Sequence, residues 1–500
     1  MSTTADQAAE IVREAGVVEP ERDSEEEKRP TQAAQLVAIA RERYHLVAST
    51  DGRLYGVPVD GPNVVQSLRG EGGLRARLAK LYNEETKGSV PSQGALASAV
   101  TVLMGIAQSG DPVPVGLRVA RHGESIVIDL GTADGRCVVV RPREWRIEAK
   151  SPVLFRRSGL TSPMVTPVKS SAGHGFDLLR GLLNIDEDGF RTLVAWLVAA
   201  CFPDIPHPVL AFKGEQGTGK STAARMAVNL VDPSPAPLRS APRDIKQWGV
   251  TASASWTVCL DNISSIQPWL SDTLCKAVTG DGVVERALFT DDDVTVMSFR
   301  RVIAMTSIDA GALAGDLAER LLLLELQPVP PELRKTDAEV NERYEKAQPA
   351  ILGALLDLLG HVLAELPTVH VERLPRMADF ARILAAIDRI TEWNTFDVYM
   401  SASVNIAADA LDGDPFGQAV RDLAYRSGSW TGTALDMLAC VPPPDPRPRN
   451  WPVDATRAGG RIKRLAPLLR SVGITVDDTK KQPSGNRSRL YTLTCETPRK

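Results

Sequence analysis

A glycine-rich segment from Gly214 to Thr222 constrains this chain more than any other part of the sequence. It reads Gly-Glu-Gln-Gly-Thr-Gly-Lys-Ser-Thr, which has the spacing G-x-x-x-x-G-K-S. Glycines permit backbone conformations that let successive N–H groups point into one anion-sized concavity. In such loops the lysine, here Lys220, reaches the β- and γ-phosphates, and the hydroxyl of Ser221 binds Mg²⁺. The residues expected to contact a nucleotide are Gly214, Glu215, Gln216, Gly217, Thr218, Gly219, Lys220, Ser221 and Thr222.

The segments on either side of this loop support the same interpretation. Residues 207–212 predict a short apolar strand, and residues 221–231 predict a helix that ends at Asp232-Pro233. A strand, a glycine loop and a helix N-terminus together form an anion site. A chance glycine loop is the alternative, and the two flanks argue against it. We therefore expect ATP and Mg²⁺ as cofactors.

Two further apolar segments end in polar residues suited to the same site. Residues 254–262 predict a buried strand with Asp261 and Asn262 at its end, the Walker B pattern. At the carboxyl end of a parallel strand, Asp261 would hold Mg²⁺ through a water; the alternative is a cap for the next helix. Residues 301–306 predict a third buried strand, and Thr306 would lie where a residue senses the γ-phosphate.

Composition limits the classes of protein that fit. The chain has 500 residues, 43% of them hydrophobic, and a net charge of −4. The length predicts about three domains. It shows no apolar run of about 18 residues and no signal-peptide pattern, so we expect no membrane span. Six scattered cysteines indicate reduced thiols of a cytoplasmic protein rather than a disulfide framework or a zinc site.

Pattern changes along the chain predict six segments of an α/β protein. They are an acidic disordered tail (1–30), a small α+β domain (31–150), a linker (151–175), a P-loop ATPase core (176–330), a helical lid (331–412) and a winged-helix domain (413–497). Two acidic runs in the chain could be taken for metal ligands, but each has a simpler structural explanation. Asp186-Glu-Asp188 is expected to cap a helix, and Asp291-Asp-Asp293 to form a solvated turn. Residues 31–150 lack the paired carboxylates of a primase or polymerase.

The C-terminal part is basic and follows the order helix, helix, helix, β-ribbon. Its last 60 residues hold thirteen basic and five acidic side chains. The third expected helix, 455–471, carries the basic residues Arg457, Arg461, Lys463, Arg464 and Arg470. Such a helix suits DNA phosphates or a major groove, and Arg461, Lys463 and Arg464 are our candidate DNA contacts. Docking on another protein is the alternative.

Several of these stretches, taken together, resemble a known helicase module. They are the loop at 214–221, Leu-Asp-Asn at 260–262, Thr-Gly-Asp-Gly-x-x-x-Arg-x-Leu-Phe-Thr-Asp at 279–291, Asp-Leu-Ala-Glu-Arg at 316–320, and segments 374–380 and 464–474. Residues 175–495 are similar to the superfamily 3-like, poxvirus-type helicase module of phage and plasmid primase-helicases, within the AAA+ ATPases. The compact order, with a hairpin between the Walker B and sensor strands, narrows the resemblance to this class.

The resemblance implies roles for further residues. Arg320 would be an arginine finger that completes the neighbouring subunit's site, which implies a homo-oligomeric, hexameric ring. Arg286 would lie on a hairpin that faces the ring channel and grips single-stranded DNA; the alternative is a cross-strand pair with the nearby aspartates. Arg376 would be a lid arginine that reaches the nucleotide.

Two departures from the family pattern affect function. Asn262 stands where many relatives have the glutamate that activates water, and an amide cannot act as a base at neutral pH. The frequent N-terminal primase domain is not evident, which implies a separate primase. The sequence thus predicts an ATP-dependent helicase or translocase of a phage or mobile-element replication system. The alternatives are a non-translocating ATP switch that assembles on DNA or protein, and a DNA-binding regulator with a vestigial loop.

Overall fold

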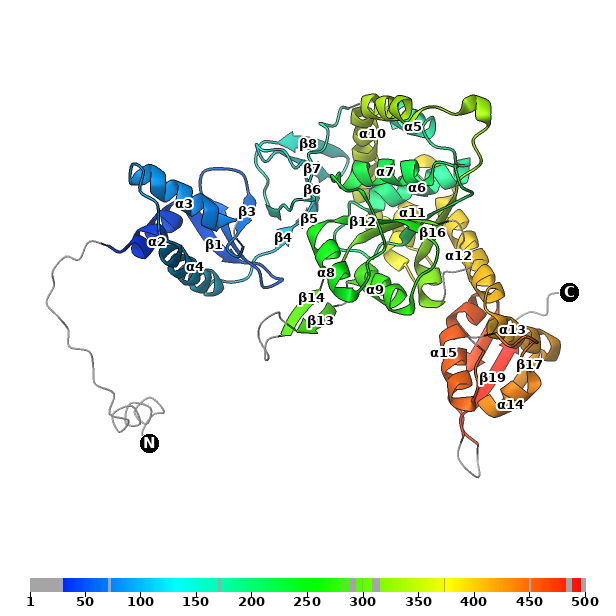
Figure 1. Ribbon diagram of the computed structural model, residues 1–500. Coiled ribbons are helices and arrows are strands. Elements are labelled where there is room, and N and C mark those ends of the chain that lie inside the picture. Colours follow the sequence, from blue (N-terminus) through cyan, green and yellow to red (C-terminus); the bar gives the residue numbers. More distant parts are fainter. Residues whose placement is uncertain are drawn as a thin grey trace, which may run out of the picture.

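The computed structural model describes residues 30–70, 73–169, 172–280, 282–286, 294–298, 300–307, 315–372, 374–448, 451–482 and 488–495. The acidic segment before residue 30 and the Asp291–Asp293 run lie outside the described residues. Figure 1 shows three bodies along the chain: an N-terminal unit in blue, a central α/β body in cyan to yellow, and a C-terminal unit in orange and red.

The N-terminal unit is a small sheet covered by three helices. Its helices are α2 (Gln32–Arg43), α3 (Leu74–Glu85) and α4 (Gln93–Gln108), and its strands are β1 (Tyr44–Ala48), β2 (Leu54–Pro58), β3 (Val64–Ser67), β4 (Val115–Gly116) and β9 (Leu154–Arg156), in the order β1-β2-β3-β9-β4. Side chains alternate across a strand. Leu54 therefore packs with the helices, while Tyr55 joins a second cluster on the other face.

A four-stranded meander follows, and it belongs to the central body. Its strands are β5 (Val119–His122), β6 (Ser125–Asp129), β7 (Cys137–Arg141) and β8 (Glu144–Glu148). Ile126, Ile128 and Val138 share one hydrophobic core with the central sheet. The expected α+β domain over 31–150 is therefore divided between two bodies. The expected linker 151–175 contains β9, which completes the N-terminal sheet.

The central sheet is entirely parallel, with the strand order β11-β12-β15-β10-β16. Its strands are β10 (Val209–Lys213), β11 (Leu238–Arg239), β12 (Thr257–Ile263), β15 (Val302–Ser307) and β16 (Leu321–Glu325). Helices α6 (Glu187–Ala199), α7 (Lys220–Val231), α8 (Ile245–Ala254) and α9 (Pro268–Thr279) accompany them. Such strands need continuous apolar runs because both faces are covered. The hairpin of β13 (Gly282–Arg286) and β14 (Val294–Ser298) lies between α9 and β15 and projects from this body (Figure 1).

Four more helices complete the central body: α5 (Ala172–Arg180), α10 (Asp337–Glu365), α11 (Ala378–Thr391) and α12 (Thr395–Asp412). Helix α10 starts at a capping box of Thr336 and Glu339. It is long and apolar enough to cross a membrane, but 61% of its most apolar window is buried within the protein. A Cβ at Gly353 would lie 1.9 Å from the Val168 carbonyl oxygen. Only glycine permits this close approach of α10 to the backbone at Val168. The close packing and the buried apolar window together identify α10 as a core helix.

The C-terminal unit contains three helices and a three-stranded sheet. They are α13 (Pro415–Ser427), β17 (Ser429–Thr433), α14 (Ala434–Cys440), α15 (Ala455–Ser471), β18 (Ile474–Asp477) and β19 (Leu490–Cys495), with the sheet order β17-β19-β18. The expected three helices and terminal hairpin are present, and β17 adds a strand that the sequence did not suggest. Helix α15 runs unbroken through Gly459, Gly460 and Pro467.

Candidate nucleotide site at the carboxyl edge of the parallel sheet

The glycine-rich loop, residues 214–219, connects the end of β10 to the start of α7. Gly217 and Gly219 have φ angles of 84° and 85°, in the left-handed region that favours glycine. Gly219 is the N-cap of α7, and no side chain caps this helix. The first N–H groups of α7 are therefore available to an anion. A Cβ at Gly214 would lie 2.8 Å from the Thr218 hydroxyl oxygen, so this loop also needs glycine for space.

Lys220 lies back over this loop. Its Nζ donates to the carbonyl oxygens of Gly214 at 2.8 Å and Glu215 at 2.6 Å. Both acceptors are neutral, and no ion pair to a carboxylate is found for Lys220 within the described residues. The lysine thus holds a positive charge against the loop that a phosphate would complement.

A short hydrogen-bond network joins three residues from different elements. The Oδ1 atom of Asp261 accepts from the Ser221 hydroxyl at 2.9 Å and from the Thr306 hydroxyl at 2.6 Å. The Thr306 oxygen in turn accepts from the Asn262 N–H at 2.8 Å. Because β15 lies between β10 and β12, Thr306 stands between the loop and Asp261. The structure therefore brings Ser221, Asp261 and Thr306 together.

Asn262 occupies an irregularity in β12. The register with β15 shifts between Leu260 and Ile263, and Asn262 has φ 56°. Asparagine tolerates this left-handed conformation better than most residues with a side chain. Its side chain is exposed at the sheet edge. The backbone thus gives a reason for asparagine that the sequence alone did not reveal.

A cavity of about 590 Å³ borders the loop at Gly217–Gly219 and Thr222. Its other walls come from residues 181–184 and 326–343, which are brought together where the Gln327 N–H donates to the Asn184 carbonyl at 2.9 Å. The apolar wall residues are Leu182, Leu183, Leu326, Val329, Leu333 and Val340, and the charged ones are Glu332, Arg334, Lys335, Asp337 and Arg343. A volume of this size is typical of small-molecule sites. Sequence reasoning missed these residues because no motif marks either wall.

The arginines suggested by the resemblance lie away from this network. Arg320 ends the 3₁₀ segment Gly315–Arg320 and directly precedes β16, at the opposite end of the sheet from the loop. It is only 7% exposed, in a segment that contacts α9, α12 and α15. Arg376 forms an ion pair with Glu319 at 2.7 Å. Arg286 ends β13, and its side chain lies outside what the structure describes.

The basic helix α15 presents some of its charges and uses others internally. Arg457, Lys463, Arg464 and Arg470 are exposed. Lys463 lies 3.3 Å from Asp478, which also pairs with Arg489 at 2.6 Å. Arg461 is only 26% exposed and pairs with Asp414, the N-cap of α13. Arg461 therefore links two helices of its own unit, which leaves Arg464 as the better placed of the expected DNA contacts.

Residues 176–410 match the family model of the actinomycete integrative conjugative element replication protein, and residues 416–500 match the model of the AICE RepA C-terminal domain. The two segments together span about two thirds of the chain. Comparison with curated proteins gives no match.

Solved structures show remote similarity. The apo C-terminal region of NrS-1, residues 305–718, is 13% identical with a TM-score of 0.37, covering 94% of this chain and all of that chain. Its A form is 12% identical with a TM-score of 0.39, covering 93% of this chain and all of that one. JCV helicase is 14% identical with a TM-score of 0.21, covering 48% of this chain and 73% of that chain.

Proposed function

This chain is a replication protein of an actinomycete integrative conjugative element, and we propose that it acts there as an ATP-dependent DNA helicase or translocase. The observation that carries the proposal is the network of Ser221, Asp261 and Thr306 beside an uncapped, glycine-preceded helix N-terminus. We place the protein in the cytoplasm, working with a separate primase.

The donor atoms at the network fit a magnesium ion. Mg²⁺ prefers hydroxyl, carboxylate and water oxygens, and Ser221 and Asp261 supply a hydroxyl and a carboxylate. The ion would neutralise charge that develops on the transferred phosphate. Lys220 and the first N–H groups of α7 bind the phosphates, and the 590 Å³ cavity takes the nucleoside. Thr306 holds the orientation of the Asp261 carboxylate through its hydroxyl.

Asn262 orients water in this scheme rather than removing its proton. The amide is exposed at the sheet edge, one residue after Asp261. Because an amide is not a base at neutral pH, hydrolysis by one isolated chain is expected to be slow. A neighbouring subunit and bound DNA would raise the rate.

Arg320 lies at the end of the sheet opposite the glycine loop, and this position is compatible with two roles. It is separated from its own glycine loop by the length of β16, five residues, or roughly 16 Å at about 3.3 Å each. It therefore either acts on a neighbouring subunit's nucleotide in a ring, after its side chain becomes uncovered, or stabilises its own chain. In trans such arginines raise rates by about 10³–10⁵.

Mixing inactive variants distinguishes these two roles. Lys220→Ala removes the phosphate contact, and Arg320→Lys shortens the finger while keeping its charge. If Arg320 acts in trans, a mixture of the two variants regains ATP hydrolysis, because some interfaces combine an intact loop with an intact arginine. A mixture as inactive as its components would assign Arg320 a structural role.

Strand displacement tests the helicase itself. A labelled duplex with one single-stranded tail is incubated with the protein and ATP, and release of the labelled strand is followed over time. The proposal predicts release by the wild type and none by Lys220→Ala. We propose two DNA contacts. One is the β13–β14 hairpin, which would face the channel of the ring, and the other is the C-terminal unit, which would act as a winged helix.

Asn262 specifically favours a second candidate, a non-translocating ATP switch. A site without a carboxylate base suits a protein that assembles on DNA while ATP is bound and turns over slowly. ATP-dependent assembly on DNA without strand release would identify the switch. Absence of any ATP binding would leave only a DNA-binding regulator.

A further inference from the structure

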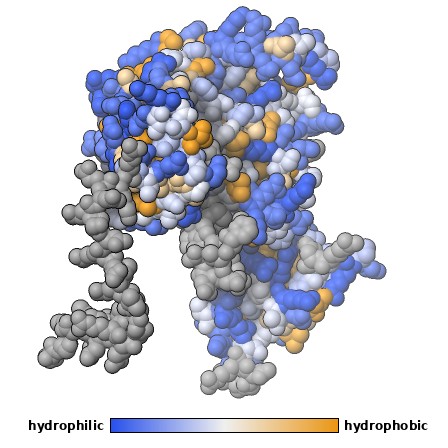
Figure 2. Space-filling model, turned by 60° about the vertical axis from the view of Figure 1, so that its left-hand side comes forward, coloured by the Kyte–Doolittle hydropathy of each residue, from blue (hydrophilic) through white to orange (hydrophobic). Residues whose placement is uncertain are grey.

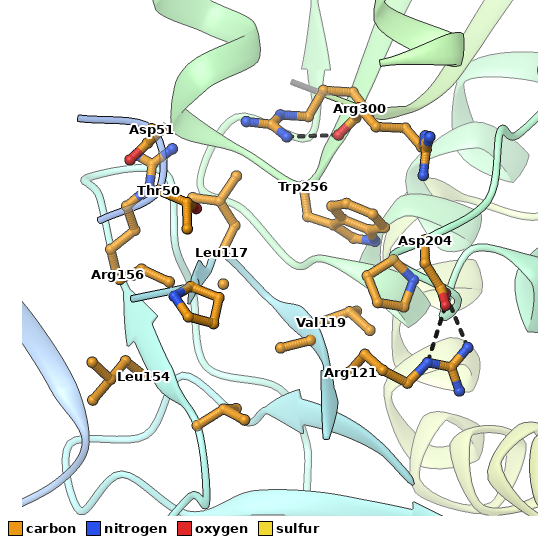
Figure 3. A pocket seen from close by; sticks show the side chains of 17 residues that line it. Thr50, Asp51, Leu117, Val119, Arg121, Leu154, Arg156, Asp204, Trp256 and Arg300 are labelled. Atoms are coloured by element: carbon orange, nitrogen blue, oxygen red, sulfur yellow. Dashed lines mark hydrogen bonds and ion pairs between the residues drawn. The ribbon is translucent and has the colours of Figure 1, made fainter. Parts of the chain in front are cut away.

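Two adjoining cavities lie where the N-terminal unit meets the central body. The first, about 460 Å³, is bordered by Thr50, Asp51, β4, β5 and Trp256 (Figure 3), and the second, about 450 Å³, by β2, β3 and the end of α8. Arg156 of β9 lines both cavities. Seven arginines line the two cavities together, against two aspartates and no glutamate.

Three of these arginines have carboxylate partners among the residues that the structure describes. Arg121 pairs with Asp204 at 2.9 Å, as Figure 3 shows, and Arg53 pairs with Asp51 at 3.2 Å. Arg157 likewise pairs with Asp129 at 2.7 Å.

Arg156 and Arg300 contact neutral groups among the described residues. Arg156 donates to the Ser253 carbonyl at 2.8 Å, and Arg300 donates to the Thr279 carbonyl at 3.2 Å. The Nε atom of Arg300 is buried with no hydrogen-bond acceptor among the described residues. Arg301 donates to the carbonyls of Ala252 and Arg300. Arg156 and Arg300, charged groups with neutral acceptors, leave room for an anion.

Capping of α8 explains part of the arrangement. Arg301 and Arg156 donate to Ala252 and Ser253 in the last turn of that helix, where cations are favourable. It does not explain why Arg53 and Arg69 face the same space from another body. Burial lowers the pKa of Arg156, and the charge of Arg53 lowers it further. Burial, with the charges of Arg156 and Arg53, lowers the pKa of Arg301 to about 9. The guanidinium groups thus repel one another, and a bound anion would relieve that repulsion.

We infer that this arginine junction, formed by Arg53, Arg69, Arg156 and Arg300, binds the phosphate groups of a DNA strand. A strand suits it better than a single anion because the lining extends through two cavities that share Arg156. Guanidinium groups bind phosphate in two-point geometry. The inference rests on the proposed action on DNA but not on ATP hydrolysis. It gives the N-terminal unit a role that the sequence did not suggest.

A hydrophobic surface patch for binding another protein has less support than the arginine junction. On the face that Figure 2 shows, the described hydrophobic residues are scattered among hydrophilic ones rather than gathered into one broad patch. Scattered apolar residues are normal on protein surfaces.

Binding of a fluorescent oligothymidylate to the full chain without nucleotide tests the inference. Arg53→Ala with Arg69→Ala removes one half-buried and one exposed arginine from the junction. The matched control, Arg41→Ala with Arg77→Ala, removes two exposed arginines of the same unit that line neither cavity. For the junction variant we expect affinity at least about tenfold weaker. Its slope of log K against log salt should be smaller by about 1.4, or about 0.7 per lost phosphate contact. Equal affinity in wild type and junction variant, or equal weakening in the control, would overturn the inference.

A second arm separates DNA from free nucleotide as the source of phosphate. ADP binding is measured by calorimetry in a Lys220→Ala background, which disables the glycine loop, with and without the two junction substitutions. Loss of residual ADP binding with unchanged DNA binding would assign the junction to a nucleotide and overturn the strand. The junction variant should keep the wild-type rate of ATP hydrolysis without DNA. That control separates failure of this inference from failure of the proposed ATPase.

Discussion

At the scale of single residues, the Thr306 hydroxyl of β15 joins the candidate site to the end of β12. It is 1% exposed, donates to Asp261 and accepts from the Asn262 N–H. Thr306→Val keeps the shape but leaves both partners with one hydrogen bond fewer. We expect hydrolysis about 10- to 100-fold slower, equal to about 1.4–2.7 kcal/mol in the barrier, with nucleotide affinity within a few-fold of wild type.

Steady-state turnover and calorimetric binding of ADP check this prediction. Thr306→Ser keeps the hydroxyl and should hydrolyse ATP at nearly the wild-type rate. A valine variant as fast as the serine variant would show that the hydroxyl has no part in the reaction.

Sequence reasoning reached some of these residues and not others. Lys220, Ser221, Asp261 and Thr306 follow from a local spacing and from the ends of buried strands, so their elements could be predicted. The bulge at Asn262, the internal ion pair of Arg461 and the burial of Arg320 depend on residues far away in the chain. No local pattern encodes such contacts.

At the scale of elements, a buried ion pair fastens the meander to the central sheet. Arg118 is fully buried, and its Nε lies 2.8 Å from Asp232, which also accepts from the N–H groups of Trp256 and Thr257. Arg118→Met leaves the Asp232 charge buried without its partner. We expect the free energy of unfolding in urea to fall by about 3–5 kcal/mol.

An exposed pair provides the comparison for that measurement. Arg146 lies 2.9 Å from Glu144 on the surface of the meander, and Arg146→Met should leave the free energy of unfolding nearly unchanged, because solvent screens an exposed pair. Losses of similar size in the two variants would contradict the role given to the buried pair.

A buried histidine between α6 and β10 makes stability depend on pH. His207 is fully buried, and its Nε2 lies 3.0 Å from the Ala199 carbonyl oxygen. Burial lowers its pKa from 6.5 to about 4. As pH falls below about 6.5 the unfolded chain takes up this proton first. The stabilisation that comes from keeping His207 neutral is therefore complete above about pH 7. It is lost between pH 6.5 and 4, and the free energy of unfolding falls by about 3 kcal/mol in all.

Urea unfolding of the wild type at pH 7, 6 and 5, beside His207→Phe, measures that contribution. The variant should lose less stability over this range, because it has no proton to take up there. His361→Gln, at an exposed histidine, serves as control and should follow the wild-type profile. Parallel profiles for wild type and His207→Phe would refute the assignment.

The elements themselves were largely predictable. Long apolar strands, the hairpin after α9 and the C-terminal helices all carry strong local patterns. The sequence did not predict the three-residue strand β9, because so short a segment has little hydrophobic pattern of its own. It is held by pairing with β4 and β3, which lie roughly 40 and 90 residues earlier in the chain. The same contact adds residues 154–156 to the N-terminal sheet, beyond the expected domain 31–150.

At the scale of the whole molecule, two groups of positive charge lie on different sides of the central body, which holds the candidate nucleotide site (Figure 1). The arginine junction lies between the N-terminal unit and the central body, and exposed basic residues of α15 lie on the C-terminal unit. In the proposed ring, a DNA strand would contact both as it passes the β13–β14 hairpins. ATP at the carboxyl edge of the parallel sheet would drive that passage.

The rate of ATP hydrolysis with and without single-stranded DNA tests this account most directly. The wild type is measured beside Lys220→Ala, at equal protein concentration and low salt. The account predicts slow hydrolysis that single-stranded DNA stimulates strongly, and no stimulated hydrolysis in the variant. A wild type that binds both ATP and DNA but shows no stimulation would contradict the motor and leave the ATP switch.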